Sequence, residues 1–366
     1  MSHPRVEKVV NIAARSNLDA VALIPGANLY YVTGLDFHLM ERPLVVFFVP
    51  GRDPVAVVPA LEEARLAACG IPMELFAWND ADGYQAAFAA AAGELKLIGK
   101  RLGVEELRMR VLEAQLIEGY FLGLKLVPAG DALADLRLRK SPEELAALRE
   151  AIAVSEGALR AVLDQIRPGM TEREIAGLLV IEQLKRGGGK HPFEPVVASG
   201  PNAALPHSEP GERRIAEHGP LLFDFGTTVR GYASDITRTF SIGEPSQRLA
   251  EVYAVVKAAN AAGRAVAGPG VPAQDVDRAA REMIEDAGYG PYFRHRTGHG
   301  LGLEAHEGPN IVEGNTQVLE PGMVFTIEPG IYLLGELGVR IEDDMVITPD
   351  GAESLTTFPR DLLPIG

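Results

Sequence analysis

Apolar positions in the first ~135 residues follow two different spacings. Some segments repeat apolar residues three and four apart, which is typical of amphipathic helices, and others are short apolar, β-branched runs typical of strands. The predicted helices span residues 5–17, 60–68, 83–92 and 111–118, and the predicted strands span residues 20–24, 44–49, 55–58 and 122–127. This alternation predicts a small α/β domain. No catalytic constellation is visible within it.

A basic connector at residues 135–140 follows, and we place a domain boundary there, between residues 1–137 and 138–366. Ser141 and Thr171 each precede a glutamate by three residues, which is the pattern of a helix capping box. They predict helices from Ser141 to about residue 166 and from Thr171 to about residue 186. Further helical patterns span residues 247–265 and 273–286.

Residues 221–242 have the pattern of a β-hairpin, with two apolar runs around a turn near Val229-Arg230-Gly231. If Val229-Arg230 is the two-residue loop, Asp224 lies directly opposite Asp235, with Cβ atoms ~5 Å apart. Asp224 interrupts the apolar run Leu-Leu-Phe-Asp-Phe, where an unpaired carboxylate is costly. The plain alternative is two exposed turn carboxylates. The apolar setting favours a cation between them.

A second hairpin repeats this arrangement. Residues 323–329 and 338–348 are strand-like and are joined by residues 333–337. Folding the segment about Gly335 places Glu328 opposite Glu342, again in an apolar setting. The two hairpins together carry four negative charges, which two divalent cations would neutralise.

Composition and charge narrow the class of protein. The 366 residues are 47% hydrophobic and 23% charged, as in an ordinary globular protein, and a net charge of −15 opposes binding to nucleic acid or anionic membranes. The single cysteine excludes an intrachain disulfide and a cysteine-based zinc site. No apolar run reaches the ~18 residues of a membrane helix, and residues 1–20 lack a signal-peptide core. We therefore expect a cytoplasmic protein.

Histidines cluster near the second hairpin. His295, His299 and His306 fall within twelve residues of a glycine-rich segment, and His207 lies in a turn-rich loop before the first hairpin. Four carboxylates with histidine and no thiolate favour Mn²⁺, Co²⁺, Mg²⁺ or Fe²⁺ over structural Zn²⁺. We expect two divalent metal ions, Mn²⁺ first, with Co²⁺ or Zn²⁺ as alternatives. Such a pair activates a bridging water and polarises a carbonyl, which suits amide hydrolysis.

That chemistry also needs proton carriers and hydrogen-bond donors for a developing oxyanion. His207, His295 and His306 are the candidates that titrate near neutral pH. Arg340 shares a strand face with Glu342 by period two, so it can support that carboxylate or bind substrate.

At this point the residues resemble a family, the metal-dependent pita-bread peptidases, and within it the proline-specific Xaa-Pro dipeptidases (prolidases) and Xaa-Pro aminopeptidases (aminopeptidase P). The resemblance covers nearly the whole chain. It is carried by Asp-Phe-Gly at 224–226, Gly-Tyr-x-Ser-Asp-x-Thr-Arg-Thr at 231–239, Gly-His-Gly-x-Gly-Leu-x-x-His-Glu at 298–307, Ile-Glu-Pro-Gly-Ile-Tyr at 327–332 and Val-Arg-Ile-Glu-Asp at 339–343.

The resemblance implies an α+β protein, with a C-terminal pita-bread (creatinase/aminopeptidase) fold at 138–366 and a smaller creatinase-like N-terminal α/β domain at 1–137 that partly covers the site in a homodimer. The implied metal ligands are Asp224, Asp235, His299, Glu328 and Glu342. Glu328 would also be the general base toward the bridging water, and His207 and His306 would stabilise the intermediate and shuttle protons. His295, Tyr332 and Arg340 would place an Xaa-Pro peptide substrate.

The chain departs from the pattern at one position. Some prolidases carry an arginine four residues after the second motif histidine, where it is thought to hold the substrate carboxylate, and this chain has Asn310 there. A dipeptidase would need another cation. The loop at residues 36–42 resembles one that some bacterial prolidases send into the partner's site, so we expect His38 or Arg42 to bind substrate.

Four other readings compete with a dipeptidase. Aminopeptidase P, which takes longer peptides with proline second, is barely separable by sequence. Methionine aminopeptidase shares the catalytic half but not the ~135-residue N-terminal region, and creatinase lacks the metal ligands. Non-catalytic members of the fold that bind chromatin or RNA lose those ligands, whereas all five are intact here and the charge is −15.

Overall fold

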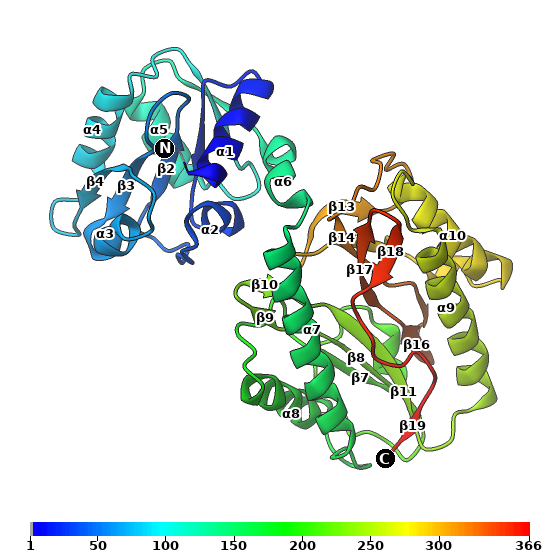
Figure 1. Ribbon diagram of the computed structural model, residues 1–366. Coiled ribbons are helices and arrows are strands. Elements are labelled where there is room, and N and C mark those ends of the chain that lie inside the picture. The colour runs from blue at the N-terminus through cyan, green and yellow to red at the C-terminus, as the bar shows by residue number, and fades with distance from the viewer. Residues whose placement is uncertain (1–2) are drawn as a thin grey trace. The chain divides into compact units, whose positions relative to one another are not determined.

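The computed structural model describes residues 3–366, which fold as two compact units that divide after Arg137 (Figure 1). Across the described residues, none of the helices combines the length and apolar character needed to span a bilayer. Each unit has its own buried core.

The N-terminal unit is built on a mixed six-stranded sheet in the order β4-β3-β2-β1-β5-β6. Its strands are β1 (Ala20–Leu23), β2 (Val45–Phe48), β3 (Val55–Pro59), β4 (Glu74–Trp78), β5 (Arg101–Val104) and β6 (Lys125–Pro128). Its helices are α1 (Pro4–Arg15), α2 (Ala27–Thr33), α3 (Ala60–Ala67), α4 (Gln85–Leu95), α5 (Val111–Tyr120) and α6 (Gly130–Leu138). The central strands β1, β2 and β3 are buried along their whole length, which explains their continuous apolar sequences.

The predicted helices and strands of this unit are confirmed, with differences of a few residues at their ends, but the pattern missed α2, α6, β4 and β5. β4 is an edge strand in which four apolar residues follow Glu74 and only Trp78 is fully buried, so its sequence lacks the alternation of a half-buried strand. The predicted connector was wrong in its first half, because residues 135–138 complete α6. There Arg137 is buried and donates to the side chain of Asn28.

The C-terminal unit contains two larger sheets and two short ribbons. One sheet has the order β19-β11-β8-β7, the other β13-β12-β14-β17-β18, and β9-β10 and β15-β16 form the ribbons. The strands are β7 (Val196–Ser199), β8 (Gly219–Phe225), β9 (Thr228–Val229), β10 (Tyr232–Ala233), β11 (Ile236–Ile242), β12 (Gly298–Gly300), β13 (Glu307–Ile311), β14 (Val324–Ile327), β15 (Gly330–Leu333), β16 (Leu337–Arg340), β17 (Asp343–Thr348), β18 (Gly351–Ser354) and β19 (Pro364–Ile365). The helices are α7 (Pro142–Leu163), α8 (Glu172–Lys185), α9 (Gln247–Val266) and α10 (Ala273–Asp286), with 3₁₀ turns at η1 (Gly200–Ala204) and η2 (Gly290–Tyr292).

The two predicted capping boxes are confirmed. Ser141 and Thr171 each accept a hydrogen bond from the backbone N–H three residues on, and the glutamate at that position accepts one from the cap's own N–H. These reciprocal bonds satisfy two backbone donors that a helix N-terminus otherwise leaves unpaired. They set where α7 and α8 begin.

The register predicted for the first hairpin was wrong by one residue in the turn. The loop is Arg230-Gly231, both with positive φ (50° and 82°), and Asp224 pairs with Thr237. Two consecutive residues in the left-handed conformation form a type I′ turn. The backbone twist of such a turn matches the right-handed twist of the two strands that it joins. The correction moves the pairing by two positions, so Asp224 and Asp235 keep the same face and become diagonal neighbours.

The register predicted for the second hairpin is confirmed. Gly330 pairs with Arg340 and Ile327 with Asp343, and that register sets Glu328 opposite Glu342. Both hairpins lose regular pairing in the middle, where β8 and β14 end and β9 and β15 have not begun. Asp235, Glu328 and Glu342 all lie in these interruptions, where the side chains are released from the ladder.

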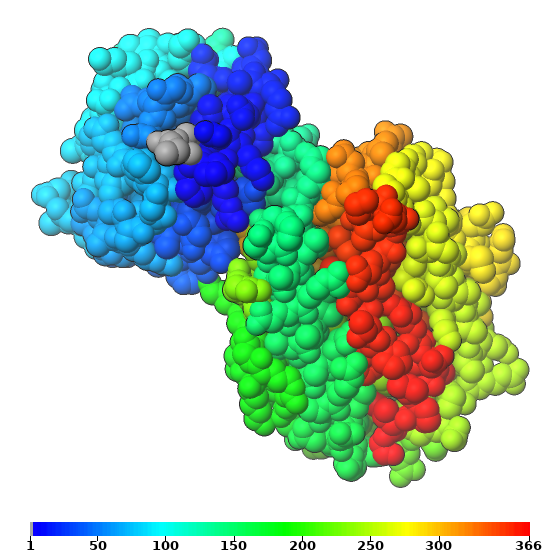
Figure 2. Space-filling model, in the orientation of Figure 1, coloured from blue at the N-terminus to red at the C-terminus, as the bar shows by residue number. Residues whose placement is uncertain are grey.

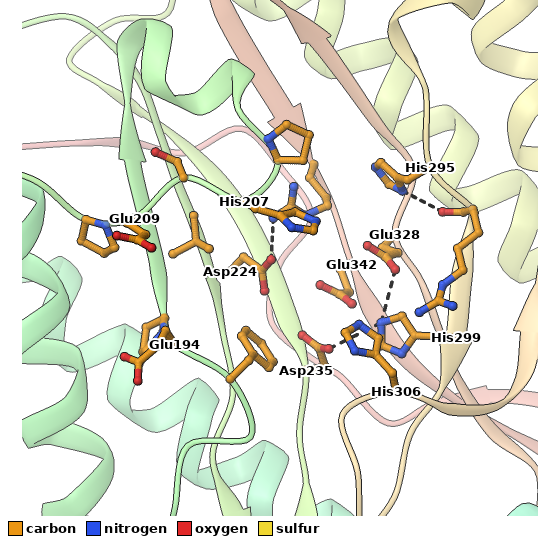
Figure 3. A pocket seen from close by; sticks show the side chains of 18 residues that line it. Glu194, His207, Glu209, Asp224, Asp235, His295, His299, His306, Glu328 and Glu342 are labelled. Atoms are coloured by element: carbon orange, nitrogen blue, oxygen red, sulfur yellow. Dashed lines mark hydrogen bonds and ion pairs between the residues drawn. The ribbon is translucent and has the colours of Figure 1, made fainter. Parts of the chain in front are cut away.

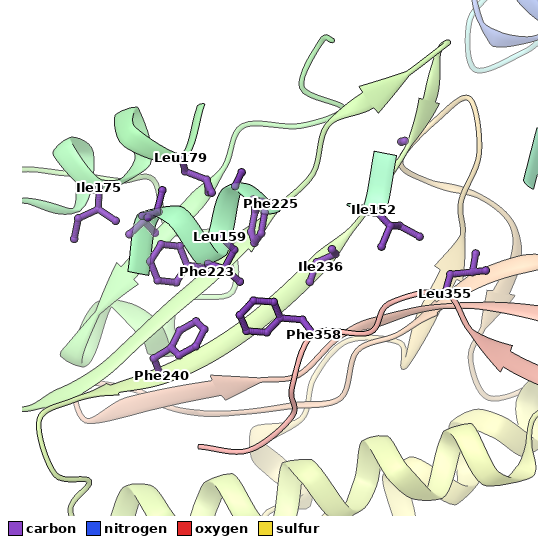
Figure 4. Close-up of a cluster of buried hydrophobic side chains, with 14 of the residues drawn as sticks. Ile152, Leu159, Ile175, Leu179, Phe223, Phe225, Ile236, Phe240, Leu355 and Phe358 are labelled. Atoms are coloured by element: carbon purple, nitrogen blue, oxygen red, sulfur yellow. The ribbon is translucent and has the colours of Figure 1, made fainter. Parts of the chain in front are cut away.

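One hydrophobic core of the C-terminal unit lies between α7, α8 and the first hairpin (Figure 4), and others lie against α9 and α10. Phe223 and Phe240 stack edge to face, and Phe240 in turn packs on Phe358 from the C-terminal segment. That segment fills the surface between α7 and α9 (Figure 2). It is tied to α7 through Glu156, which accepts from the backbone of Phe358, and to α9 through Tyr253.

Candidate metal centre

A pocket of about 630 Å³ lies in the C-terminal unit, over the two interrupted hairpins (Figure 3). Its polar lining includes nine of the predicted site residues, which come from segments far apart in the sequence: His207, Asp224, Asp235, His295, His299, His306, Glu328, Arg340 and Glu342. An apolar wall of Phe193, Pro195, Val196, Pro206 and Pro210 completes it. The pocket therefore joins a concentrated polar site to an apolar surface, as small-molecule sites do.

Three of these side chains lie closest together. Ligand atoms of Asp235, His299 and Glu342 all fall within 4.8 Å of one another, and all three residues are buried. Glu328 borders the group, with its Oε1 atom 3.3 Å from His299 Nε2. Asp224 lines the same pocket but forms an ion pair with Arg340 in this structure.

His299 is held in one orientation by its surroundings. Its Nδ1 atom lies 3.1 Å from the carbonyl oxygen of Gly300, and a carbonyl can only accept, so Nδ1 carries the proton. The unprotonated Nε2 then faces Asp235, 3.7 Å away, as well as Glu328. Burial, with the nearby charges of His306 and Arg296, lowers the pKa of His299 to about 3. A lone pair directed at carboxylates is stabilised by a cation between them.

Steric crowding by neighbouring backbone explains why His299 has a glycine on each side. A Cβ atom at Gly298 would lie 1.8 Å from the carbonyl oxygen of Thr326, and one at Gly300 would lie 1.9 Å from that of Gly308. Only glycine lets β12 pass this close to the neighbouring backbone. The Gly-His-Gly motif therefore fixes where the imidazole enters the site.

The carboxylates show the same need for a cation. Burial raises the pKa of Asp235 and Glu342 well above the usual range, and the neighbouring carboxylates raise both further. Burial and the charge of Asp224 raise the pKa of Glu328 to about 8. One buried oxygen each of Asp224 and Asp235 has no hydrogen-bond partner. This donor set, oxygen-rich with one imidazole, fits divalent metal.

Arg340 organises the side of the pocket next to Asp224. Besides its ion pair with Asp224, it donates to the hydroxyls of Tyr332 (2.7 Å) and Thr237 (3.1 Å). Thr237 in turn donates to Glu342 at 2.6 Å. Arg340 therefore supports Asp224 directly and Glu342 through Thr237. The predicted support of Glu342 by Arg340 thus runs through the Thr237 hydroxyl.

The remaining predicted residues fall into three settings. His295 uses both ring nitrogens, one 2.9 Å from the Tyr332 hydroxyl and one 2.7 Å from the Arg296 carbonyl. Tyr332 is buried and is not among the residues that line the pocket. His207 and His306 line the pocket and keep part of their surface exposed to solvent. His38 is an exposed loop residue of the N-terminal unit. No described contact brings it to the site, so its role stays a prediction.

Three polar residues of this region were missed from the sequence. Thr237 and Asp344 are each two positions from a predicted ligand, so period two along a strand could have found them. Asp344 accepts from the backbone N–H of Asp235 at 3.2 Å and is fully buried. Arg296 lines the pocket beside His295 and had no distinguishing pattern.

The raised carboxylate pKa values predict how the metal-free protein responds to pH. Between pH 7.5 and 8.5 the unfolded chain has ionised carboxylates and largely neutral histidines, whereas folded Glu328 titrates with a pKa of about 8. The folded state holds more protons, so stability falls as pH rises through this window. We expect a lower melting temperature at pH 8.5 than at pH 7.5 without metal, and a larger gain from Mn²⁺ at pH 8.5. A metal-free melting temperature that rises across this window would contradict the assignment.

Comparisons with known proteins agree with this geometry. Residues 146–349 match Metallopeptidase family M24, and residues 5–139 match the Creatinase/Prolidase N-terminal domain. The chain belongs to metallopeptidase family M24. The predicted fold, a pita-bread unit with a creatinase-like N-terminal unit, is confirmed.

Individual relatives are similar over nearly the whole length. An uncharacterised peptidase of Bacillus subtilis (strain 168) is 34% identical over 98% of this chain and 99% of its own length. A crystal structure of a prolidase from Thermococcus sibiricus has a TM-score of 0.93 at 36% identity, covering 99% of this chain and 98% of that one. A crystal structure of an X-Pro aminopeptidase from Thermotoga maritima MSB8 has a TM-score of 0.85 at 32% identity, covering 99% and 100%.

Proposed function

We propose that this protein is a dinuclear-metal Xaa-Pro dipeptidase, with aminopeptidase P activity on longer peptides as the alternative. The observation that carries the proposal is the buried group of Asp235, His299 and Glu342, whose ligand atoms all lie within 4.8 Å of one another. The similar prolidase and X-Pro aminopeptidase structures supply the proline-specific substrate class. The catalytic unit would be residues 138–366.

The proposed ligands are Asp224, Asp235, His299, Glu328 and Glu342. Divalent ions, Mn²⁺ in the first instance, would supply an activated water and polarise the scissile carbonyl. In the described structure Asp224 points one oxygen at Arg340 and leaves the other unpaired, so it has a free ligand atom. Arg340 and Thr237 would hold Asp224 and Glu342 in place as supporting residues.

The protein's own groups would carry the protons. Glu328 has a pKa of about 8 in the metal-free protein, so its carboxyl can hold a proton near neutral pH, which suits a general base that later returns it. Partial burial and the charge of Arg296 lower the pKa of His306, so its ring is neutral at pH 7 and can donate a hydrogen bond to the carbonyl oxygen. His207 faces the same space and would act with it.

Initial rates on Ala-Pro and Ala-Pro-Ala, with Mn²⁺ and with a chelator, test the proposal. We expect rapid cleavage of Ala-Pro and loss of that activity on chelation, restored by added metal. Faster cleavage of Ala-Pro-Ala would establish the aminopeptidase alternative instead. If the Mn²⁺-loaded protein cleaves neither peptide, the proline-specific assignment is wrong.

The homodimer and the role of His38 belong to the same proposal. An exposed loop at residues 36–42 would bring His38 to a partner's pocket, as the resemblance implies. Unchanged Ala-Pro hydrolysis by a His38→Ala variant would contradict that role without affecting the metal centre.

A further inference from the structure

The pocket contains one arginine that has no acidic partner. Among its described lining residues the arginines are Arg296 and Arg340, and Arg340 already pairs with Asp224. Arg296 donates from Nη1 to the side-chain oxygen of Asn310 at 2.7 Å. That acceptor is a neutral amide, and no carboxylate lies within ion-pair distance of Arg296 in the described part of the chain. Its charge is therefore left for a ligand.

Neighbouring groups show that this charge acts at the metal site. The burial of His306 is the main cause of its lowered pKa, and the positive charge of Arg296 is the next. The charge of Arg296 also contributes to the low pKa of His299. The same charge lowers the pKa of Glu328 and so offsets part of the increase that burial causes. The guanidinium thus lies beside the proposed chemistry, between the segment that carries His295 and the ligand strand β12.

We infer that Arg296, positioned by Asn310, binds the C-terminal carboxylate of a dipeptide substrate. The inference rests on the proposed function, and it makes Arg296 the residue that selects dipeptides over longer peptides. Only the proline Cα separates the scissile nitrogen from the carboxylate carbon in Xaa-Pro, a span of roughly 2.5 Å by standard bond lengths, so the anchor must lie next to the metal centre. Nη1 is used by Asn310, whereas Nε and Nη2 remain free to bind a carboxylate through two parallel hydrogen bonds.

Asn310 explains why this arrangement needs no arginine four residues after His306. The asparagine amide accepts from Arg296 without neutralising it, whereas an acidic residue there would form an ion pair and block the ligand. In a longer peptide the proline carboxylate is replaced by a neutral amide. Arg296 would then have lost its water without gaining an ionic partner, which disfavours that substrate.

The rates on Ala-Pro and on its C-terminal amide, Ala-Pro-NH₂, test whether Arg296 binds the substrate carboxylate, because the amide lacks that charge. We expect the Mn²⁺-loaded wild-type enzyme to prefer the acid. In an Arg296→Met variant, kcat/KM for Ala-Pro should fall roughly 10- to 100-fold, mainly through KM, as for loss of a charged hydrogen bond. The rate on Ala-Pro-NH₂ and the bound metal content should stay within about twofold of wild type.

Two further variants sharpen the result. Asn310→Asp keeps the arginine and pairs it with a carboxylate, so it should lose activity on Ala-Pro selectively. Arg294→Met is a matched control that removes an exposed arginine outside the pocket. Within residues 3–366 its side chain donates only to the Pro291 carbonyl, so the rates on both substrates should stay unchanged.

The outcomes distinguish the two proposals. Equal losses on the acid and the amide in Arg296→Met, or no loss on either, would overturn the role of Arg296 while leaving the dipeptidase intact. A wild-type enzyme that cleaves Ala-Pro-NH₂ as well as Ala-Pro would do the same. Failure of the wild type to cleave Ala-Pro would overturn the proposed function, and the anchor with it.

Discussion

Replacing Asp235 by Asn should reduce hydrolysis of Ala-Pro by on the order of 1000-fold, because it removes a central metal ligand. Asp235 is buried, and its ligand oxygen lies within 4.8 Å of those of His299 and Glu342. An amide oxygen is a weaker, uncharged ligand, so the cluster loses the charge that divalent metal needs. The measurement is kcat/KM together with metal content after gel filtration, and both should fall.

The same substitution should not unfold the metal-free protein. Burial and the charges of Glu342 and Asp224 make ionised Asp235 unfavourable, so a neutral isostere removes repulsion. We expect a metal-free melting temperature at pH 8 at least equal to that of the wild type. Asp286→Asn, at the exposed end of α10, is the matched control and should retain metal and activity. An Asp235→Asn variant that keeps full metal content and full activity would exclude Asp235 as a ligand.

The hairpins show what the sequence could and could not predict. The second hairpin was placed in its correct register because Gly335, with a φ of 79°, marks the turn unambiguously. The first was displaced because Arg230 shares the left-handed conformation with Gly231, and a non-glycine residue there carries no pattern. The two aspartates still fell on the same face, since an even displacement preserves the alternation of a strand.

The long-range contacts of the site had no local signal. Arg340 reaches Asp224, 116 positions earlier in the chain, and Asn310 of β13 accepts from Arg296, which lies in the segment before β12. Periodicity describes which face a residue occupies, but it does not say which distant side chain lies opposite. The sequence therefore predicted the residue types of the pocket better than their hydrogen-bond partners.

Arg340→Met should destabilise the metal-free protein by about 3–5 kcal/mol, the usual cost of removing one partner of a buried ion pair. The Arg340 side chain is 3% exposed and that of Asp224 is 18% exposed. One oxygen of Asp224 already lacks a partner and the other would lose Arg340, while the Tyr332 and Thr237 hydroxyls would each lose a donor. Urea unfolding of the chelated protein, followed by far-ultraviolet circular dichroism, measures the loss. Trp78, the only tryptophan, reports on the N-terminal unit alone.

The double variant Asp224→Asn/Arg340→Met separates a buried charge from lost packing. If the cost arises from leaving Asp224 ionised and unpaired, neutralising it should recover much of the stability lost in Arg340→Met. Arg340→Lys should recover little, because one ammonium cannot reproduce the three directions in which the guanidinium donates to Asp224, Tyr332 and Thr237. Arg248→Met breaks a surface ion pair with Glu336 and should leave the unfolding midpoint near that of the wild type. A double variant no more stable than Arg340→Met would show that Arg340 supports the fold by packing rather than by balancing Asp224.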